Sequence, residues 1–586
     1  MHFSAFGRSV VFILPFLTAA GAAGAAEANA AGANAANNAA PVAQASSAWD
    51  SYTTDFIEWY YSVNPSLAVV AGRHEYDGQL PDWSPAAFQA VVSRLHVERN
   101  RVQRFKSDQL DAHQRFERDV LAAEIDRELF VLETMREPFR NPAYYGDPLD
   151  PDPYLSRDYE PLEQRMKAFI AYEKALPKAV EQIRANLKTP MPKTFVGLGH
   201  VQFGGYVSFF RDEIPPIFQS VKDPALQDAL REANAKAIQA VQSVDAWFHE
   251  QEAGANDSFA LGIQRFEEML WATDRLRVPV VTLKKLGEAD LERNERALAE
   301  ACATYTPGKS VDECIKVFRS DKASGPPVET ARAQLDALKA FVVSHDIVSI
   351  PAPEQAQVHE SPAYQRWNMA YISVPGPYEK NIPATYYIAP PDPNWTKEEQ
   401  AEYIPAKDDL LFTSVHEVWP GHYLQFLHGN RSWSKVGRVF QSYEFAEGWA
   451  HYGEELMWEE GLGAGDAEAH IGQLTNALER NVRLLSAIGL HTGNMTVAQS
   501  EAMFRERAHM DPGDSRQQAA RGTFDPQYGD YTLGKLMIRK LRDEWTAGRG
   551  GRASWKSFHD EFLSYGTSPI PLVRRAMLGD DPGPPL

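Results

Sequence analysis

Cysteine is scarce in this sequence: Cys302 and Cys314 are the only two among 586 residues. Neither cysteine has the spacing of a metal-binding motif, so zinc bound by cysteine is not supported. In an oxidising compartment the two residues could close one local disulfide, and two buried free thiols are the alternative. The spacing of twelve positions does not decide between these states.

Positive charge is also in short supply. The chain has 59 Lys and Arg against 79 Asp and Glu, a net charge of −20. A surface of this sign repels phosphate backbones and anionic lipids, so we expect no nucleic-acid partner and no binding to anionic membranes. The sequence also lacks a Gly-x-Ser-x-Gly segment, the turn that carries the nucleophile of many serine hydrolases.

Long apolar runs are confined to the N-terminus. Arg8 precedes a short apolar stretch that Pro15 interrupts, and small residues continue to Ala26. This order is typical of a secretory signal peptide, which we predict over 1–26, with no cysteine nearby to carry a lipid anchor. The Ala- and Asn-rich segment 27–47 is predicted to be a flexible linker. We therefore expect a periplasmic or secreted protein without a membrane anchor after cleavage.

The remaining chain is predicted to be mainly α-helical. Its length exceeds what one hydrophobic core usually serves, so we expect an N-terminal helical lobe over 48–345 and a second lobe over 346–586. Two proline-bounded segments rich in β-branched and aromatic residues, 369–375 and 383–391, predict strands of a small sheet. Helical periodicity and its stop signals predict helices over 49–62, 85–106, 111–135, 160–187, 224–251, 284–303, 327–345, 405–428, 439–459, 466–492, 526–547 and 554–564.

The segment HEVWPGH, residues 416–422, has the composition of a zinc-hydrolase motif with two residues inserted. In the usual H-E-x-x-H form, the two His lie on one helix face and bind zinc, and the Glu acts as general base. Six positions separate the His here, which a regular helix would turn about 120° apart. The Pro-Gly pair inside the segment breaks the helix. We therefore predict that His416 and His422 bind one Zn2+ ion and that Glu417 is the base; a chance match is the alternative.

The third zinc ligand is expected from the helical segment 442–456. Four of its ionisable residues recur at spacings of three, four and three and share one face: Glu444, Glu447, His451 and Glu454. Such a stripe would repel itself if buried without a cation, and exposure to solvent is the alternative. We choose Glu447 as the ligand because the glycine after it permits close approach of another backbone. His451 and Glu454 are expected to orient the zinc-binding side chains.

Four segments resemble the bacterial domain-of-unknown-function 885 family. They are VTLKKLGEADLERNERAL (281–298), HEVWPGH (416–422), EGWAHYGEEL (447–456) and QYGDYTLGKLMIRKLRDEW (527–545). They occur in the family's order, so that 48–586 resembles one such unit. Members of the family look like gluzincin-type metallopeptidases. The resemblance therefore implies a large two-lobed helical architecture, with a small β-sheet next to the zinc-site helix.

The resemblance implies the same roles for His416, His422, Glu417 and Glu447 as the motif does. The family commonly has a further His after the Pro-Gly-His, where this chain has Tyr423. A tyrosine position of the family falls on Tyr531, which is our candidate hydrogen-bond donor to the oxyanion that develops during peptide hydrolysis.

Further candidates for substrate binding lie on both sides of the motif. Tyr528 is the second choice as oxyanion donor, and packing at a helix start is the alternative for both tyrosines. Arg539 and Arg542 could hold the terminal carboxylate of a peptide, or form a solvated helix face. By resemblance to gluzincins, the predicted strands would bind extended substrate at a sheet edge, with Tyr386 and Tyr387 lining the cleft.

These observations predict a zinc metallopeptidase with one Zn2+ per chain that hydrolyses oligopeptides or unfolded segments. Glu417 would take a proton from the attacking water and return it to the leaving amine. A zinc amidase or esterase acting on a non-peptide substrate is the second hypothesis. The third is a periplasmic binding protein that keeps the fold without catalysis, against which the intact Glu417 argues.

Overall fold

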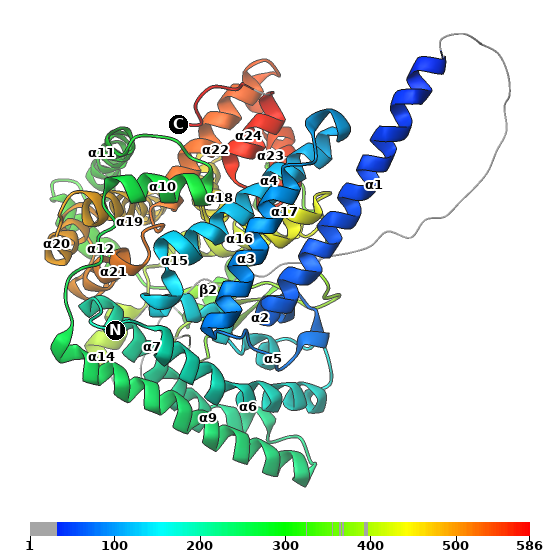
Figure 1. Cartoon of the computed structure of the whole chain (residues 1–586). Coiled ribbons are helices and arrows are strands. Elements are labelled where there is room, and N and C mark those ends of the chain that lie inside the picture. Colours follow the sequence, from blue (N-terminus) through cyan, green and yellow to red (C-terminus); the bar gives the residue numbers. More distant parts are fainter. Residues whose placement is uncertain are drawn as a thin grey trace.

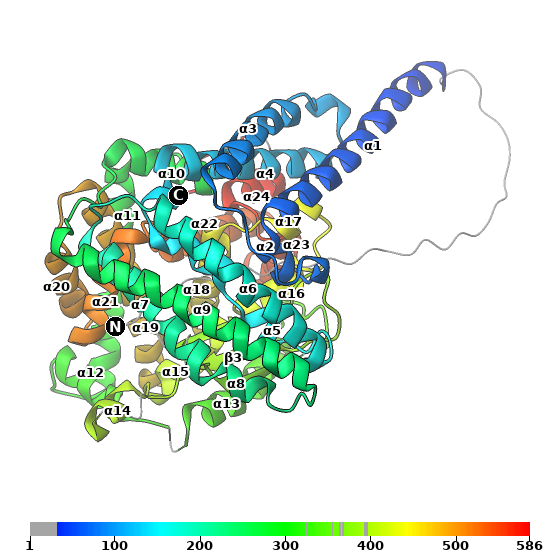
Figure 2. The same ribbon diagram turned by 60° about the horizontal axis from the view of Figure 1, so that its bottom comes forward.

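The computed structural model describes residues 32–323, 325–353, 355–362, 365, 369–391, 396–463, 465–579 and 581–586. The predicted signal peptide over 1–26 lies outside these residues. Within them the protein is mainly α-helical with one small sheet, as predicted. Figures 1 and 2 show the helices gathered into one body, from which the start of the first helix projects.

Helix α1 (Gly32–Val63) corrects the prediction of a flexible linker, because residues 32–47 belong to its N-terminal part. Alanine has the highest intrinsic helix propensity, so an Ala-rich segment can continue a helix that is anchored at its other end. The anchor is apolar: Trp49 and Phe56 are buried in the core.

The first half of the chain is built from helices that begin and end at recognisable signals. Ser84, Asp111, Asp223 and Ser310 cap the starts of four of them with their side chains. The helices after α1 are α2 (Pro65–Val70), α3 (Pro85–Val102), α4 (Ala112–Leu129), α5 (Asp152–Ser156), α6 (Leu162–Asn186), α7 (Lys193–Asp212), α8 (Ile214–Phe218), α9 (Pro224–Gln251), α10 (Ile263–Asp274), α11 (Val280–Tyr305), α12 (Val311–Ser320) and α13 (Pro327–Ser344).

The second half carries the helices that hold the candidate site. The predicted helix over 405–428 is divided into two, and the helix predicted over 439–459 begins only at Tyr443. The helices are α14 (Lys397–Tyr403), α15 (Lys407–Glu417), α16 (His422–Gly429), α17 (Lys435–Val439), α18 (Tyr443–Glu459), α19 (Ala467–Thr492), α20 (Val497–Arg507), α21 (Pro512–Phe524), α22 (Asp530–Ala547), α23 (Trp555–Ser564) and α24 (Ile570–Leu578).

Three short strands form the sheet, in the order β1-β3-β2. Strands β2 (Ala370–Ser373) and β3 (Ala384–Ile388) lie within the two predicted segments and pair antiparallel. Strand β1 (Ala356–Glu360) was not predicted, and it pairs parallel with β3. The sheet lies against α13 and α15, which places it beside the HEVWPGH segment.

Helices from both sides of the predicted lobe boundary at 345/346 share a core. Helix α11 from the first half packs along α19 from the second, and α4 contacts α17 and α24. Buried apolar residues of both halves, such as Leu291 and Leu484, belong to one cluster. The two-lobe division therefore stays a prediction, and the candidate site lies where these long-range contacts are dense.

Helices α18 and α22 cross at two glycines. A methyl group on Gly534 would lie 2.0 Å from the carbonyl oxygen of Glu444 and 2.6 Å from Cα of Gly448. We expect Gly534→Ala to lower the free energy of unfolding by about 1–3 kcal/mol, because the two backbones must separate. The midpoint of thermal unfolding should fall accordingly. Gly548→Ala is the control, since nothing lies within 4 Å of its added methyl group. Equal midpoints for the two variants would contradict this packing.

Cys302 and Cys314 form a disulfide between α11 and α12, which decides between the two alternatives above. Cross-links that close short loops typically contribute about 2–4 kcal/mol. We expect the double variant Cys302→Ser/Cys314→Ser to speed amide hydrogen exchange in α12 while exchange in the distant α23 stays unchanged. Unchanged exchange in α12 would show that packing alone holds it.

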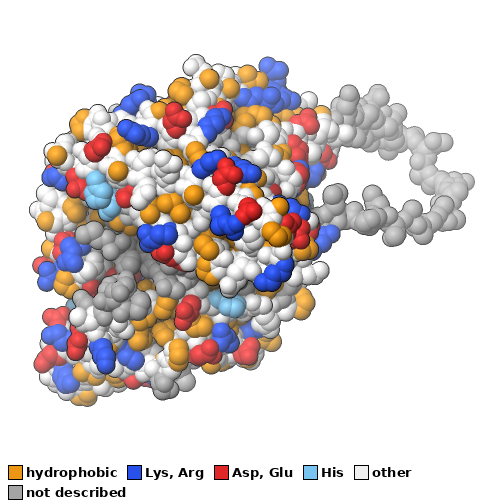
Figure 3. Space-filling model, turned by 90° about the horizontal axis from the view of Figure 1, so that it is seen from below, with side chains coloured by type: hydrophobic (Ala, Val, Ile, Leu, Met, Phe, Trp, Pro, Cys, Tyr) orange, Lys and Arg blue, Asp and Glu red, His pale blue; other side chains and the backbone are white. Residues whose placement is uncertain are grey.

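One face of the molecule carries charges of both signs (Figure 3). On the face shown in Figure 3, basic and acidic side chains alternate with hydrophobic ones, and no broad basic field appears. Among the described residues, no helix combines the length and apolar composition that crossing a bilayer requires.

Candidate metal centre

The HEVWPGH segment opens between its two histidines, as predicted. Helix α15 ends at Glu417 and α16 begins at His422, so the four residues between them leave the helical path. The backbone N–H of Gly421 donates to the carbonyl of Val415 at 3.0 Å, which folds the turn back onto α15. The two imidazole rings therefore lie 4.8 Å apart, nearly perpendicular to each other.

Only glycine fits at the base of this turn. A methyl group on Gly421 would lie 1.7 Å from the carbonyl oxygen of His416 and 2.4 Å from that of Val415. The backbone of the turn thus lies directly on the last turn of α15. This contact brings His422 back to the side of His416, which a regular helix could not do.

Helix α18 supplies the third group of the cluster. Oε2 of Glu447 lies 3.4 Å from Nε2 of His416 and 3.4 Å from Nε2 of His422. The three side chains are buried, and their candidate ligand atoms all lie within 4.8 Å of one another. Burial alone would raise the pKa of Glu447, but the two histidines outweigh it and hold this pKa below its usual range. Glu447 is therefore an ionised carboxylate between two imidazoles.

The two distances to Glu447 fit a tetrahedral zinc ion. Zinc bonds of about 2.0–2.2 Å to nitrogen and oxygen separate two ligand atoms by roughly 3.4 Å in tetrahedral geometry. Among the described residues, neither ring nitrogen of His422 nor Oε2 of Glu447 has a hydrogen-bond partner. Each buried polar atom without a partner costs about 1–3 kcal/mol. Two imidazoles and a carboxylate are a common ligand set of catalytic zinc, so the residues fit this ion.

Glu454 orients the first histidine. Its Oε1 lies 2.6 Å from Nδ1 of His416, and Oε2 lies 3.3 Å from Nδ1 of His451. Burial opposes ionisation of Glu454, but Arg480 and His451 hold its pKa below the usual range. The ionised carboxylate accepts a hydrogen bond from Nδ1–H of His416, which leaves Nε2 to face Glu447.

The stripe of ionisable residues on α18 is buried, so its exposure to solvent is excluded. Glu444, however, faces away from the histidines. It accepts a hydrogen bond from the backbone N–H of Ile570 at 2.9 Å. Burial and the nearby Asp274 carboxyl raise the pKa of Glu444 well above its usual value. The carboxylates on this face of α18 thus have different surroundings. Only Glu447 lies between histidines, where a cation could bind.

Glu417 lies at the end of α15 and is 9% exposed. Burial raises the pKa of its carboxyl, and the neighbouring His416 and His422 partly oppose this shift. Tyr386 of β3 approaches from the sheet, with its hydroxyl 3.5 Å from Oγ of Ser414 on α15. The carboxylate therefore lies beside the histidine pair, at the boundary between the sheet and α15.

Tyr531 lies at the cluster, at the start of α22. Its ring stacks against that of His416, with centroids 6.1 Å apart. Burial is the main cause that raises its pKa, and the charge of Glu447 adds to this shift, so Tyr531 stays protonated. The ring of Tyr531 therefore lies beside the imidazole of His416.

Two arginines of α19 that the sequence analysis did not single out approach the same tyrosine. The guanidinium carbons of Arg480 and Arg483 lie 5.8 and 4.8 Å from the centre of the Tyr531 ring. Arg480 also lies 3.4 Å from the carboxylate of Glu454. Their spacing of three positions, one helical turn, was the only signal in the sequence.

Four residues that were predicted to bind substrate make their contacts away from the cluster of His416, His422 and Glu447. The hydroxyl of Tyr528 donates to Ser486 at 2.7 Å, and Tyr387 stacks on Tyr371 on the other side of the sheet from Tyr386. Arg539 pairs with Glu455 at 3.0 Å, and Arg542 pairs with Glu459 at 3.2 Å. The two tyrosines are therefore held by packing and a hydrogen bond, and the two arginines by ion pairs from α22 to α18.

Two solved structures are similar to this chain over nearly its whole length. One is a candidate lipoprotein of unknown function from Shewanella oneidensis, with a TM-score of 0.73 and 23% sequence identity, covering 90% of this chain and 99% of that one. Another is a candidate lipoprotein from Colwellia psychrerythraea, with a TM-score of 0.75 and 17% identity, covering 93% and 99%. At these identities the similarity shows the fold alone.

A comparison with curated proteins finds no match. The family described as bacterial protein of unknown function (DUF885) matches residues 65–577, which include every helix from α3 to α23 and the whole HEVWPGH segment. The chain therefore belongs to the DUF885 family.

Proposed function

We propose that this protein is an exported zinc-dependent peptidase of metallopeptidase-like architecture. The observation that carries the proposal is the buried cluster in which one oxygen of Glu447 lies 3.4 Å from Nε2 of both His416 and His422. A carboxylate beside the cluster, a tyrosine hydroxyl and two arginines complete the set of groups that hydrolysis of an amide needs.

The chain would divide the chemistry among these residues. When bound, zinc would lower the pKa of water and polarise the carbonyl of the scissile bond. Glu417 would accept the proton of the attacking water at its carboxylate and deliver it to the leaving amine nitrogen. Tyr531 would donate its hydroxyl proton in a hydrogen bond to the carbonyl oxygen as negative charge develops there. Glu454 would hold the His416 ring in place throughout.

Extended, flexible peptides are the substrate class that this geometry favours. The side chains of His416 and His422 are only 6% and 8% exposed, so the rigid surface of a folded protein could not reach them without rearrangement. A flexible peptide segment is narrower than a folded surface and would need a smaller opening to reach them. Strand β3 pairs on both sides, so an extended chain could pair only with an edge strand, of which β2 contacts α15.

The test is a combined measurement of zinc and hydrolysis. We expect the dialysed parent protein to retain zinc and to cleave members of a peptide mixture, as followed by elemental analysis and mass spectrometry. His422→Ala and Glu447→Ala should lose both properties, while His359→Ala, at an exposed histidine of β1, should keep both. A parent that binds no zinc, or variants that still cleave, would overturn the proposal.

A further inference from the structure

A second cluster of candidate metal ligands lies on the surface, on helices α7 and α9. It consists of His200 from α7 with Asp245 and His249 from α9, and it shares no residue with the centre around His416. The three candidate ligand atoms all lie within 4.8 Å of one another. Asp245 and His249 are four positions apart on one helix, so both side chains lie on the same face.

The packing of the two helices creates this arrangement. Helices α7 and α9 run side by side along one face of the body (Figure 2). At Gly199 a methyl group would lie 2.2 Å from the ring of Phe248, so only glycine lets this ring lie against the backbone of α7. The residues that follow these two in sequence, His200 and His249, are therefore brought together, with ring centroids 3.9 Å apart.

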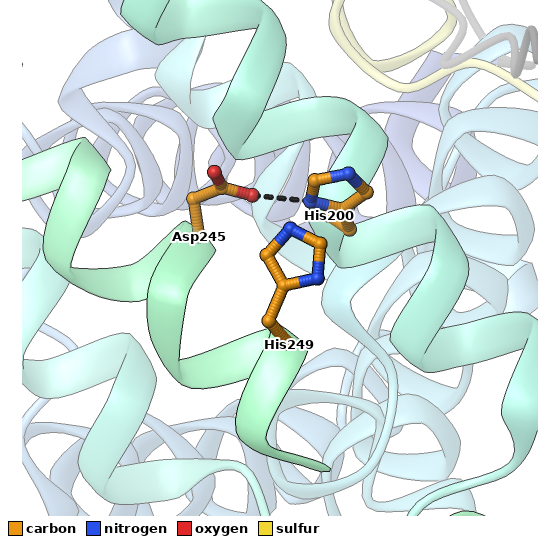
Figure 4. Close-up of side chains that lie close together, drawn as sticks. All are labelled: His200, Asp245 and His249. Carbon is orange, nitrogen blue, oxygen red and sulfur yellow. Dashed lines mark hydrogen bonds and ion pairs between the residues drawn. The ribbon is translucent and has the colours of Figure 1, made fainter. Parts of the chain in front are cut away.

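The orientation of His249 is set from outside the cluster. Its Nδ1 lies 2.9 Å from a carboxylate oxygen of Glu252, which begins the next turn of the chain. The other ring nitrogen, Nε2, is thus the one that points towards the space between His200 and Asp245 (Figure 4). A carboxylate that binds the far nitrogen of a histidine is the usual support of metal-binding imidazoles.

The other two groups already interact. Nδ1 of His200 lies 2.5 Å from Oδ1 of Asp245, a contact drawn in Figure 4. A bound ion would replace this hydrogen bond by one bond to each residue. Their side chains are 39% and 20% exposed, so small rotations can open the gap to the roughly 3.4 Å that two ligands of one ion require.

The geometry points to a surface site for a divalent first-row transition metal, held by His200, Asp245 and His249 and oriented by Glu252. Two imidazoles and one carboxylate suit zinc, cobalt, nickel and copper, whereas calcium and magnesium prefer oxygen ligands. The exposed side of the cluster leaves the remaining coordination positions to water. The ion would tie α7 to α9 at a point where only side chains connect them.

The test uses the full chain without an affinity tag, with its tightly held zinc retained after dialysis. We titrate further Zn2+ into it by calorimetry and count binding sites. The parent should bind one more ion than His249→Ala, and Glu252→Gln should bind that ion about 10–100-fold more weakly, because the ring loses its orienting partner. The same number of sites in the parent and in His249→Ala would overturn the inference.

His96→Ala is the matched control. His96 pairs with Glu133 at 3.0 Å on the surface, and both side chains are about half exposed. Among the described residues this pair belongs to no group of three candidate metal ligands. The control should therefore bind as many ions as the parent, and a loss of one ion in His96→Ala would contradict the assignment to α7 and α9. The difference of one ion between the parent and His249→Ala can be measured even if the buried centre around His416 binds no zinc.

Discussion

Glu417→Gln is expected to keep zinc at the parent level and to lower the rate of peptide hydrolysis by about 10²–10⁴-fold. The physical reason is that an amide of the same shape cannot accept a proton from water, whereas His416, His422 and Glu447 remain unchanged. The rate at saturating peptide concentration, measured beside zinc content by elemental analysis, checks this expectation.

Glu402→Gln serves as the control for Glu417→Gln. Glu402 is an exposed carboxylate on α14, and its loss should change neither property. Unchanged hydrolysis in Glu417→Gln would place the base elsewhere in the site. Loss of zinc together with hydrolysis would show that Glu417 binds the metal, in which case the proposed division of roles would be wrong.

Gly421→Ala is expected to abolish zinc retention and hydrolysis while leaving most of the helical structure intact. The added methyl group would lie 1.7 Å from the carbonyl oxygen of His416, and neither backbone segment can yield without moving His422. Because the site needs ligand atoms within a few tenths of an ångström of their places, a shift of this turn removes one ligand. Zinc content and far-ultraviolet circular dichroism together distinguish loss of the site from unfolding.

Gly429→Ala is the matched control for this variant. Gly429 ends helix α16, and a methyl group there would make only ordinary contacts, the nearest at 3.6 Å to Thr567. This variant should keep zinc and hydrolysis. Zinc at the parent level in Gly421→Ala would show that the turn does not control the distance between the two histidines.

Elements with a strong local pattern could be predicted from the sequence. Helix α9 has the predicted bounds, and β2 and β3 lie within the segments that prolines bound. The break between α15 and α16 was also predictable, because proline and glycine act on the backbone at their own positions. Helix α7 was missed, since its many glycines and aromatic residues obscure the helical period. Strand β1 was missed because polar residues such as Gln357 and His359 occupy its exposed positions.

Some residues of the candidate site could also be predicted from the sequence, and others could not. The motif itself singled out His416, Glu417 and His422, and the glycine after Glu447 favoured this acid among its neighbours on α18. The arginines of α19 could not be found, because an arginine that faces a buried site and one that faces solvent have the same spacing in a helix. Tyr386 and Tyr387 are adjacent in sequence, yet only the first points towards α15, since successive side chains of a strand point to opposite faces.

The sequence by itself determined the helical class, the opening of the HEVWPGH turn and the residue types suited to a metal. These depend on backbone preferences and side-chain chemistry, which act over a few residues. Only the tertiary structure decided that α18 and α22 cross at Gly448 and Gly534, so that Glu447 and Tyr531 meet the histidines while Glu444 turns away. It likewise brought His200 to His249. The physical reason is that distances between segments far apart in the chain follow from how the helices pack, which no local pattern contains.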